Sequence, residues 1–186
     1  MLALATVFAA TLLNAADAPR WTIDYTKSRM TFTAEQAGAS FEGAFTKFTA
    51  DVRFAGDALQ SSQAVVTVPT AAVDSQNEER DGYLRGEGWF ESAAFPNVVW
   101  KSERFEALGG DRYRALGKMT VRDGTFDVAV EFAVKQAGRD ATLDGTAKLD
   151  RLALGLGLGD WANTEWVGKD VLLRVTLVGH LDTSAP

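Results

Sequence analysis

The amino-acid sequence predicts an all-β protein: an antiparallel barrel of eight strands, with a short helical segment covering one mouth. Three observations predict this class. Apolar and polar residues alternate with a period of two along most of the chain, and hairpin signals separate the alternating segments. Only residues 74–101, rich in charges and then in Trp and Phe, break the repetition.

The clearest alternation lies in residues 125–136, where every second side chain is apolar. That row comprises Phe126, Val128, Val130, Phe132 and Val134. A period of two directs one row towards an interior and the other towards water, as in a half-buried antiparallel strand. The same pattern recurs in residues 140–151 and 169–182, so two further strands are expected there.

Turn residues separate these strands. Arg122-Asp123-Gly124 and Ala137-Gly138-Arg139-Asp140 are typical of hairpin connections. The expected strands are residues 21–35, 41–55, 62–69, 97–106, 111–121, 125–136, 140–151 and 169–182. Regular spacing without a long helical pattern favours a barrel over a doubly wound α/β fold.

The second expected strand contains a change of register. Its apolar residues occupy odd positions up to Phe45 and even positions from Phe48 to Phe54. A β-bulge near Lys47 would keep both sets directed inwards and would bend the strand, as closing a barrel requires.

Two stretches do not fit a strand. Residues Thr70 to Glu91 carry apolar residues at roughly helical intervals, so one or two short helices are expected over one mouth. Residues Leu154 to Gly168 contain four glycines and two tryptophans, which indicates an irregular loop with close backbone approach. No repeat or linker divides residues 19–186, so a single domain is expected.

Residues 1–18 are interpreted as a signal peptide. The apolar run from Leu2 to Leu13 is followed by Ala16-Asp17-Ala18, which has the pattern of a signal-peptidase site. The run is shorter than the roughly 20 residues that span a bilayer. No basic residue precedes it, so an N-terminal buried helix is the alternative interpretation. Export to the periplasm is expected.

Composition excludes several function classes. The chain has 25 acidic and 19 basic residues and no basic cluster, which argues against nucleic-acid binding. Without cysteine it has neither disulfides nor thiolate metal sites. Its one histidine, His180, lies in the last expected strand and cannot by itself supply a zinc site. We therefore expect no catalytic residues, no metal and no cofactor.

Small residues on the expected inward rows are consistent with an internal cavity. They are Gly43, Ala50, Ala64, Ala115, Gly117, Gly145 and Ala147. An eight-stranded barrel either is filled by side chains or holds one slender ligand. The small residues therefore have two interpretations: they leave room for a ligand, or they accommodate Phe and Trp side chains from the facing wall.

Several short motifs together resemble the YceI-like family of bacterial lipid-binding proteins. They are Trp21-x-Ile23-Asp24-x-x-x-Ser28-x-x-x-Phe32, Gly43-x-Phe45-x-x-Phe48, Arg80-Asp81-x-x-Leu84, Phe90 with Phe95-Pro96, and Leu149-Asp150-Arg151. The resemblance covers nearly the whole expected mature chain. It implies a lipocalin-like barrel, often periplasmic, that encloses an isoprenoid such as a polyprenyl phosphate or a quinone tail. The loop with Trp161 and Trp166 resembles a subgroup found beside cytochrome b561-type membrane domains.

The resemblance and the inward rows together give a set of candidate ligand-binding residues. They are Phe32, Phe41, Phe45, Phe48, Val66, Val68, Arg80, Asp81, Leu84, Trp89, Phe90, Trp100, Met119, Phe132, Trp161 and Trp166. The family's usual histidine near the opening motif is absent. Arg80 and Arg85 stand beside Glu78, Glu79 and Asp81, so we expect them to be paired. A neutral quinone head is then at least as well suited as a phosphate.

The main hypothesis is a non-catalytic carrier of an amphiphilic isoprenoid lipid. One alternative is an enzyme that acts on a lipid with carboxylates such as Asp81, Glu87 or Glu91, which requires two carboxylates inside the cavity. Another is an interaction module for a cytochrome b561-type membrane protein, which would be favoured by a barrel packed solid. A homodimer is a further hypothesis.

Overall fold

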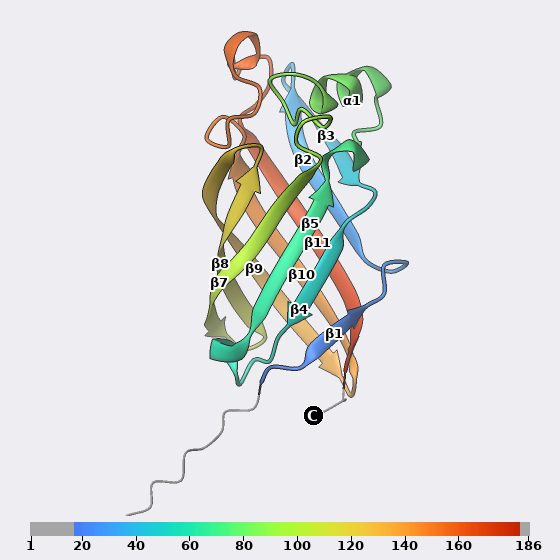
Figure 1. The fold of residues 1–186 in the computed structure, drawn as a ribbon, viewed down its shortest axis with the longest axis vertical. Helices are drawn as coiled ribbons and strands as arrows, with labels where there is room; N and C mark the ends of the chain where they lie inside the picture. Colours follow the sequence, from blue (N-terminus) through green and yellow to red (C-terminus); the bar gives the residue numbers. More distant parts are fainter. Residues whose placement is uncertain (1–16, 183–186) are drawn as a thin grey trace, which may run out of the picture.

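The computed structural model describes residues 17–182 of the chain, which form a tall barrel with helix α1 (Glu78–Arg85) at one end (Figure 1). The expected signal peptide, residues 1–18, lies outside the described residues except for Asp17 and Ala18. None of the helices within residues 17–182 has the length and apolar character needed to cross a bilayer.

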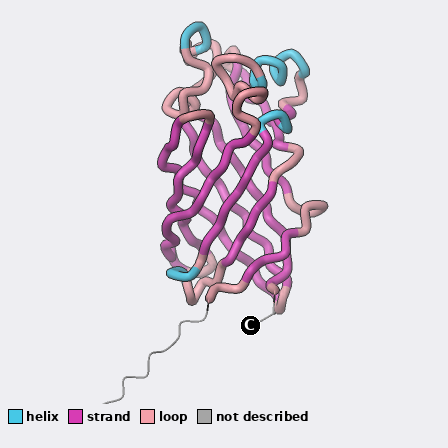
Figure 2. The backbone as a smooth tube through the Cα atoms, viewed as in Figure 1, coloured by secondary structure: helices cyan, strands magenta, loops and turns pink. Residues whose placement is uncertain are grey.

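The barrel consists of tilted strands that cross one another in projection (Figure 2). The strands are β1 Arg20–Ile23, β2 Arg29–Gln36, β3 Ala39–Phe45, β4 Thr49–Arg53, β5 Gln63–Pro69, β6 Val73–Asp74, β7 Asn97–Gly109, β8 Arg112–Val121, β9 Gly124–Ala137, β10 Asp140–Asp150 and β11 Asp170–Leu181. Short 3-10 helices cover Leu59–Ser61, Thr70–Ala72 and Gly159–Trp161.

These segments make up the eight strands of a closed antiparallel barrel, because three of its strands are each interrupted once. The first interrupted strand consists of β1 and β2, and both pair with β11. In the second, β4 pairs with β1 and β3 pairs with β2. In the third, β5 pairs with β4 and β6 pairs with β3. The remaining strands follow in the order β7-β8-β9-β10-β11. The pairing of β1 with both β4 and β11 closes the sheet, so the predicted eight-stranded barrel is confirmed.

The interruptions differ from the sequence prediction. The expected strand 21–35 is broken by a turn in which the Ser28 N–H donates to the Asp24 carbonyl at 3.0 Å. The expected bulge at Lys47 was wrong: the chain leaves the strand at residues 46–48, where the Thr46 N–H donates to the Ala72 carbonyl at 2.9 Å. This break serves the same purpose as a bulge, since Gly43 and Ala50 are both buried. Register shifts occur instead in β7, between Ser102 and Arg104 and again further along the strand.

Helix α1 forms because Asn77 caps it. The Asn77 side chain accepts a hydrogen bond from the Arg80 N–H at 2.9 Å, which satisfies a donor that has no partner inside the helix. The helix is the next element after β6, from which residues 75–77 separate it, and it lies over one end of the barrel (Figure 1). The expectation of a short helix in residues 70–91 is confirmed.

The opposite end of the barrel is closed by aromatic rings. The Phe54 ring centroid lies 5.0 Å from that of Tyr113, 5.3 Å from Phe132, 5.6 Å from Phe105 and 6.5 Å from Trp21. A side chain at Gly56 would collide with the Tyr113 hydroxyl, because an added Cβ would lie 2.2 Å from it. We call Phe54 and the four rings around it, those of Trp21, Phe105, Tyr113 and Phe132, the plug. Any large ligand therefore reaches the interior from the α1 end.

Candidate functional site

The barrel contains an apolar cavity of about 420 Å³ beneath α1 and the 154–168 loop. A smaller cavity of about 100 Å³ lies deeper, towards the plug. The same five residues line both cavities, and we call them the collar: Met30, Val68, Val98, Met119 and Leu173. The upper cavity alone falls in the range of about 300–1,000 Å³ that is typical of small-molecule sites. The barrel is therefore not packed solid, and the observation that would have favoured the interaction-module hypothesis is not made.

Most of the candidate ligand-binding residues lie on the walls of these cavities. The upper cavity is lined by Phe32, Phe41, Phe45, Val68, Arg80, Leu84, Trp89, Phe90, Met119, Trp161 and Trp166. The lower cavity is lined by Val66, Val68, Trp100, Met119 and Phe132. The wall positions agree with the inward rows of the sequence, while a role in binding stays a prediction.

Two candidates lie away from the cavity walls. Phe48 falls in the break between β3 and β4, where its ring centroid is 5.7 Å from that of Tyr25. Asp81 is buried, but its carboxylate faces the chain between β6 and α1 and accepts hydrogen bonds from Ser75. Neither residue lines a cavity, since Phe48 packs against Tyr25 and Asp81 is bonded to Ser75 and Arg85, so a role of these two residues in binding stays a prediction.

The small inward residues support both interpretations, each at different positions. An added Cβ at Gly43 would lie 2.4 Å from the Phe32 ring, and one at Gly117 would lie 2.8 Å from the Trp100 ring. At these two positions the missing side chain makes room for an aromatic ring. Ala64, Ala115 and Ala147 instead line the lower cavity, where their small size leaves space.

Aromatic rings form much of the upper wall. Phe32 packs against Phe41 and Phe45 with centroid distances of 6.1 Å and 5.6 Å. On the side of the 154–168 loop, Trp161 lies 6.0 Å from Trp89 and 5.1 Å from Tyr83. These rings join β2, β3, α1 and the two loops into one continuous apolar surface.

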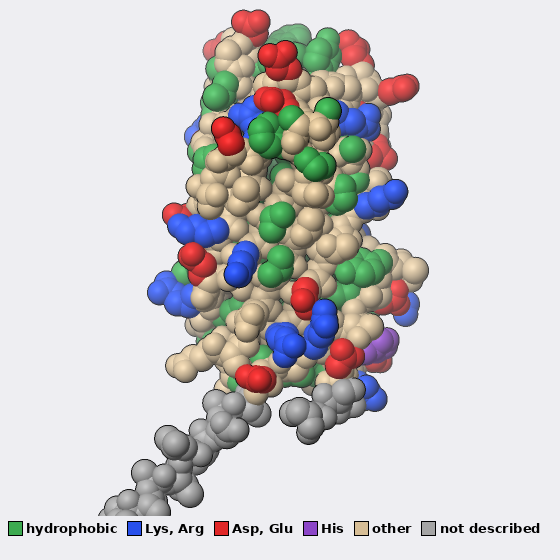
Figure 3. Space-filling view, in the orientation of Figure 1, with side chains coloured by type: hydrophobic (Ala, Val, Ile, Leu, Met, Phe, Trp, Pro, Cys, Tyr) green, Lys and Arg blue, Asp and Glu red, His purple; other side chains and the backbone are tan. Residues whose placement is uncertain are grey.

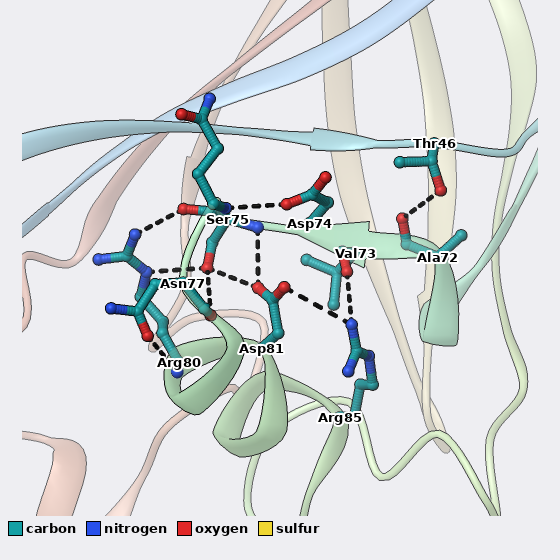
Figure 4. A network of polar contacts seen from close by, with 10 residues as sticks. Thr46, Ala72, Val73, Asp74, Ser75, Asn77, Arg80, Asp81 and Arg85 are labelled. Carbon is teal, nitrogen blue, oxygen red and sulfur yellow. Dashed lines mark hydrogen bonds and ion pairs between the residues drawn. The ribbon is translucent and has the colours of Figure 1, made fainter.

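Polar groups gather at the rim of the cavity, and Arg80 is the central one. Its Nε–H donates to the Ser75 hydroxyl at 2.9 Å, and its two Nη groups donate to the Ser75 carbonyl at 2.6 Å and to the Gln36 side chain at 3.0 Å (Figure 4 shows the Ser75 contacts). Arginine has five N–H donors, so two remain for another partner. Within residues 17–182, no carboxylate forms an ion pair with Arg80.

The expected pairing of both arginines with acidic neighbours is therefore correct only for Arg85. Arg85 lies 3.6 Å from the Asp81 carboxylate and also donates to the Val73 carbonyl at 3.0 Å (Figure 4). Arg80 keeps an unpaired positive charge beside the cavity. This result changes the electrostatic argument, because an acceptor on a ligand can use that charge.

Ser75 is a functional candidate that the sequence did not reveal. It is 1% exposed, and the Asp81 carboxylate accepts hydrogen bonds from its N–H at 2.8 Å and its hydroxyl at 2.5 Å. The Ser75 hydroxyl proton is thereby committed to Asp81, which leaves the oxygen as an acceptor for the Arg80 Nε–H. The chain Asp81–Ser75–Arg80 fixes the guanidinium in place before any ligand binds.

Arg151 belongs to the Leu149-Asp150-Arg151 motif, but the sequence did not reveal its role. It is 3% exposed and its guanidinium donates to the backbone carbonyls of Leu156, Gly157, Trp161, Val167 and Gly168, over distances of 2.7–3.0 Å. Burial lowers the pKa of Arg151 below its ordinary value, although arginine remains charged in proteins. All five donors are used, so Arg151 holds the loop around the cavity rather than binding a ligand directly.

A further ion pair joins three segments near the mouth. The Arg122 guanidinium donates to the Glu91 carboxylate at 2.7 Å and also to the Gly155 carbonyl. Arg122 lies in the turn between β8 and β9, Glu91 follows Phe90, and Gly155 starts the glycine-rich loop. The pair therefore connects the barrel wall to both loops that carry the aromatic rim.

The carboxylates proposed for an enzyme are not arranged for catalysis in the cavity. Asp81 and Glu91 are engaged as described, and Glu87 does not line either cavity. Of the lining residues that the structure describes, only Glu79 carries a carboxylate, and it is exposed at the rim. His180 is on the outer wall beside Asp140. The pair of cavity carboxylates that the enzyme hypothesis requires is not found among residues 17–182.

Large apolar side chains are exposed around the mouth. Tyr83, Leu158 and Trp166 are 49%, 52% and 56% exposed, and they come from α1 and the 154–168 loop. Figure 3 shows apolar side chains interspersed with acidic ones at this end of the molecule. Trp161 and Trp166, expected at a mouth from the sequence, do lie there.

Comparison with known proteins places the chain in a family. The model of the YceI-like domain matches residues 21–179. A UPF0312 protein of Shewanella oneidensis is 29% identical over 139 residues, which cover 73% of this chain and 71% of that protein.

Solved structures have the same fold. BcnA of Burkholderia cenocepacia is 30% identical with a TM-score of 0.80, and the alignment covers 84% of this chain and 99% of that chain. A polyisoprenoid binding domain from Saccharophagus degradans, implicated in plant cell wall breakdown, has 13% identity and a TM-score of 0.69, with coverage of 89% and 99%. Since the family model spans most of the sequence, the resemblance expected from the motifs is confirmed, and the chain belongs to the YceI-like domain family.

Proposed function

We propose that the protein is a non-catalytic binding or carrier protein for an amphiphilic isoprenoid lipid, with the tail inside the barrel and the head at the mouth beside Arg80. The observation that carries this proposal is the cavity of about 420 Å³, whose walls are apolar and whose polar groups gather at the rim. The polyisoprenoid binding domain of the same fold supports the choice of ligand class.

The energetics of the proposal rest on burial of the tail. One isoprene unit removes on the order of 100 Å² of apolar surface from water, which corresponds to roughly 2.5 kcal/mol at ~25 cal/mol per Å². A few units offset the cost of ordering the ligand. The head group then sets orientation more than affinity.

Two head groups fit the rim, and both offer oxygen acceptors to Arg80. A phosphate would use the two remaining guanidinium donors as charge-assisted hydrogen bonds. A quinone carbonyl would accept one of them without adding charge beside the exposed Glu79. The unpaired charge of Arg80 favours the phosphate, whereas the acidic neighbours favour the quinone, so both remain candidates for the head.

The setting of this function is also a proposal. The expected signal peptide supports a periplasmic protein, and the resemblance to a subgroup beside cytochrome b561-type domains supports such a membrane protein as a partner. A homodimer is a separate proposal.

A titration of lipid-free protein tests the proposed ligand class. A prenyl monophosphate, a prenyl quinone, the matching prenol and a straight-chain fatty acid are each added while intrinsic tryptophan fluorescence is recorded, because Trp89 and Trp161 line the cavity. Saturable binding of a prenyl phosphate or quinone, tighter than that of the fatty acid, is the expected result. No saturable binding by any prenyl lipid contradicts the proposal.

A further inference from the structure

The interior of the barrel is divided into two chambers by the collar. The upper chamber contains every charged lining residue, whereas the lower chamber is lined only by apolar side chains. The polar atom of its one tryptophan is satisfied internally, since the Trp100 indole N–H donates to the Val128 carbonyl at 3.1 Å. The lower chamber is therefore suited to hydrocarbon alone.

Two methionines of the collar face each other across the barrel. Met30 lies on β2 and Met119 lies on β8, and each is buried. Four steps around the sheet, from β8 through β9, β10 and β11 to β2, separate them, which is half of the eight-stranded circuit. They therefore extend from opposite walls at the level where the two cavities meet.

Methionine suits an adjustable constriction. Its side chain is unbranched, rotates about three bonds and adapts to irregular apolar surfaces. Val68 and Val98 of the collar are β-branched and rotate less freely. A change of rotamer at Met30 or Met119 could thus admit a thin chain without moving the strands.

We infer that Met30 and Met119 determine the length of the isoprenoid tail that the protein holds. This inference rests on the proposed function and adds a specificity to it. A short tail fills the upper chamber and ends at the collar. A longer tail passes between the two methionines into the lower chamber and ends against the plug, where Ala64, Ala115 and Ala147 leave space.

Two opposite changes test the inference. Met119→Ala widens the collar, and Met119→Leu is its control because it nearly conserves volume. Ala147→Leu fills the lower chamber from β10, and Ala115→Leu does so from β8, so that one of them serves if the other is destabilised by overpacking. Thermal unfolding first confirms that each variant is folded.

The measurement is competitive loading with one head group throughout. Lipid-free protein is incubated with an equimolar mixture of farnesyl, geranylgeranyl and octaprenyl monophosphate in a mild detergent, and native mass spectrometry gives the occupancy of each. Because the ratio of bound octaprenyl to bound farnesyl phosphate comes from a single sample, differences between preparations in the fraction of protein able to bind lipid cancel.

The inference makes a signed prediction for that ratio. Met119→Ala raises it by about tenfold, the Ala147 or Ala115 variant lowers it by about tenfold, and Met119→Leu leaves it within about twofold. If prenyl phosphates bind but the ratio moves by less than about twofold in the first two cases, the collar does not set tail length. If the wild-type protein takes up no prenyl phosphate at all, the lipid-binding function is contradicted and the collar hypothesis falls with it.

Discussion

The Cζ atom of Arg80 lies 3.6 Å from the centre of the Phe41 ring, so the guanidinium stacks on the aromatic wall of the cavity. Ser75 and Gln36 accept hydrogen bonds from its nitrogens. A cation placed in this way is fixed in position without being neutralised. It is the feature of the mouth best suited to orient the head group of a lipid.

Removing the charge of Arg80 should weaken the binding of an anionic head more than that of a neutral one. Arg80→Met is expected to lower affinity for a prenyl monophosphate by about tenfold to a hundredfold, since a charge-assisted hydrogen bond contributes about 1.5–3 kcal/mol. The matched control is Arg112→Met, which removes an exposed arginine at the start of β8. The fluorescence titration measures both. Equal affinity of Arg80→Met and wild type for the phosphate would show that Arg80 does not contact the head.

Ser75→Ala should weaken the contact between Arg80 and the head group indirectly, because Ser75 holds the guanidinium in position. The variant removes the acceptor for the Arg80 Nε–H and one hydrogen bond to Asp81, so we expect unfolding to become easier by about 1–2 kcal/mol and phosphate affinity to fall. Thr46→Ala is the control, because the Thr46 hydroxyl donates to the Ala72 carbonyl nearby and does not contact Arg80 (Figure 4). Urea unfolding and the titration give both numbers. Affinity unchanged in Ser75→Ala would mean that the Ser75 hydroxyl is not needed to hold Arg80, whose bond to the Ser75 carbonyl the substitution leaves in place.

Arg151→Met should loosen the loop at the mouth. Five carbonyls, all at least partly buried, lose their donor, and we expect a loss of about 3 kcal/mol or more in the free energy of unfolding. Arg151→Lys should recover little, because a compact ammonium group cannot replace the planar five-donor guanidinium. Hydrogen exchange should speed up in residues 154–168.

Lys169→Met is the control for Arg151. It removes an exposed ion pair with Asp150 at 3.2 Å, which should contribute less than about 1 kcal/mol. An Arg151→Met protein as stable as Lys169→Met, with unchanged exchange in the loop, would contradict the role given to Arg151.

Asp24 should contribute to stability against acid. The Thr26 hydroxyl, 2.6 Å away, and then the Lys27 ammonium stabilise the carboxylate and lower the pKa of Asp24 from its ordinary 3.8 to about 2. Because the native state holds this carboxylate ionised, its contribution is complete above about pH 3.8 and is lost as the pH falls through about 2. Thr26→Ala should raise the Asp24 pKa in an NMR titration. An unchanged pKa would assign the shift to Lys27 and to the backbone N–H of residue 26, which the substitution leaves in place.

The barrel was largely predictable from the sequence because the alternation within each strand indicates which side chains face the interior. The large apolar residues from Phe126 to Val134 alternate with acidic residues and alanines, and this period directs them inwards in any closed sheet. The turns at Asp123-Gly124 and Gly138 carry the residues that hairpins need. The same alternation accounts for the correct placement of most wall residues, since an inward position in a barrel is a position on its cavity.

The breaks and the polar contacts were not predictable in the same way. Whether residues 46–48 bulge or leave the strand depends on the Ala72 carbonyl, which is far away in sequence. The i,i+4 spacing on α1 places Arg85 beside Asp81, whereas the contacts of Arg80 with Ser75 and Gln36 depend on how the fold brings these segments together. Arg151 was quoted as part of a motif, but its role depends on the path of a glycine-rich loop without periodicity. Its position directly before that loop was the one available signal.

The most direct test of the account is to purify the protein from the cells that naturally produce it, record its mass under native conditions and identify the extracted ligand. A stoichiometric adduct that proves to be a prenyl phosphate or a prenyl quinone is the predicted result, and its head group decides between the two candidates. A protein free of lipid that also takes up no prenyl phosphate or quinone from detergent would contradict the central claim and would favour the interaction-module hypothesis.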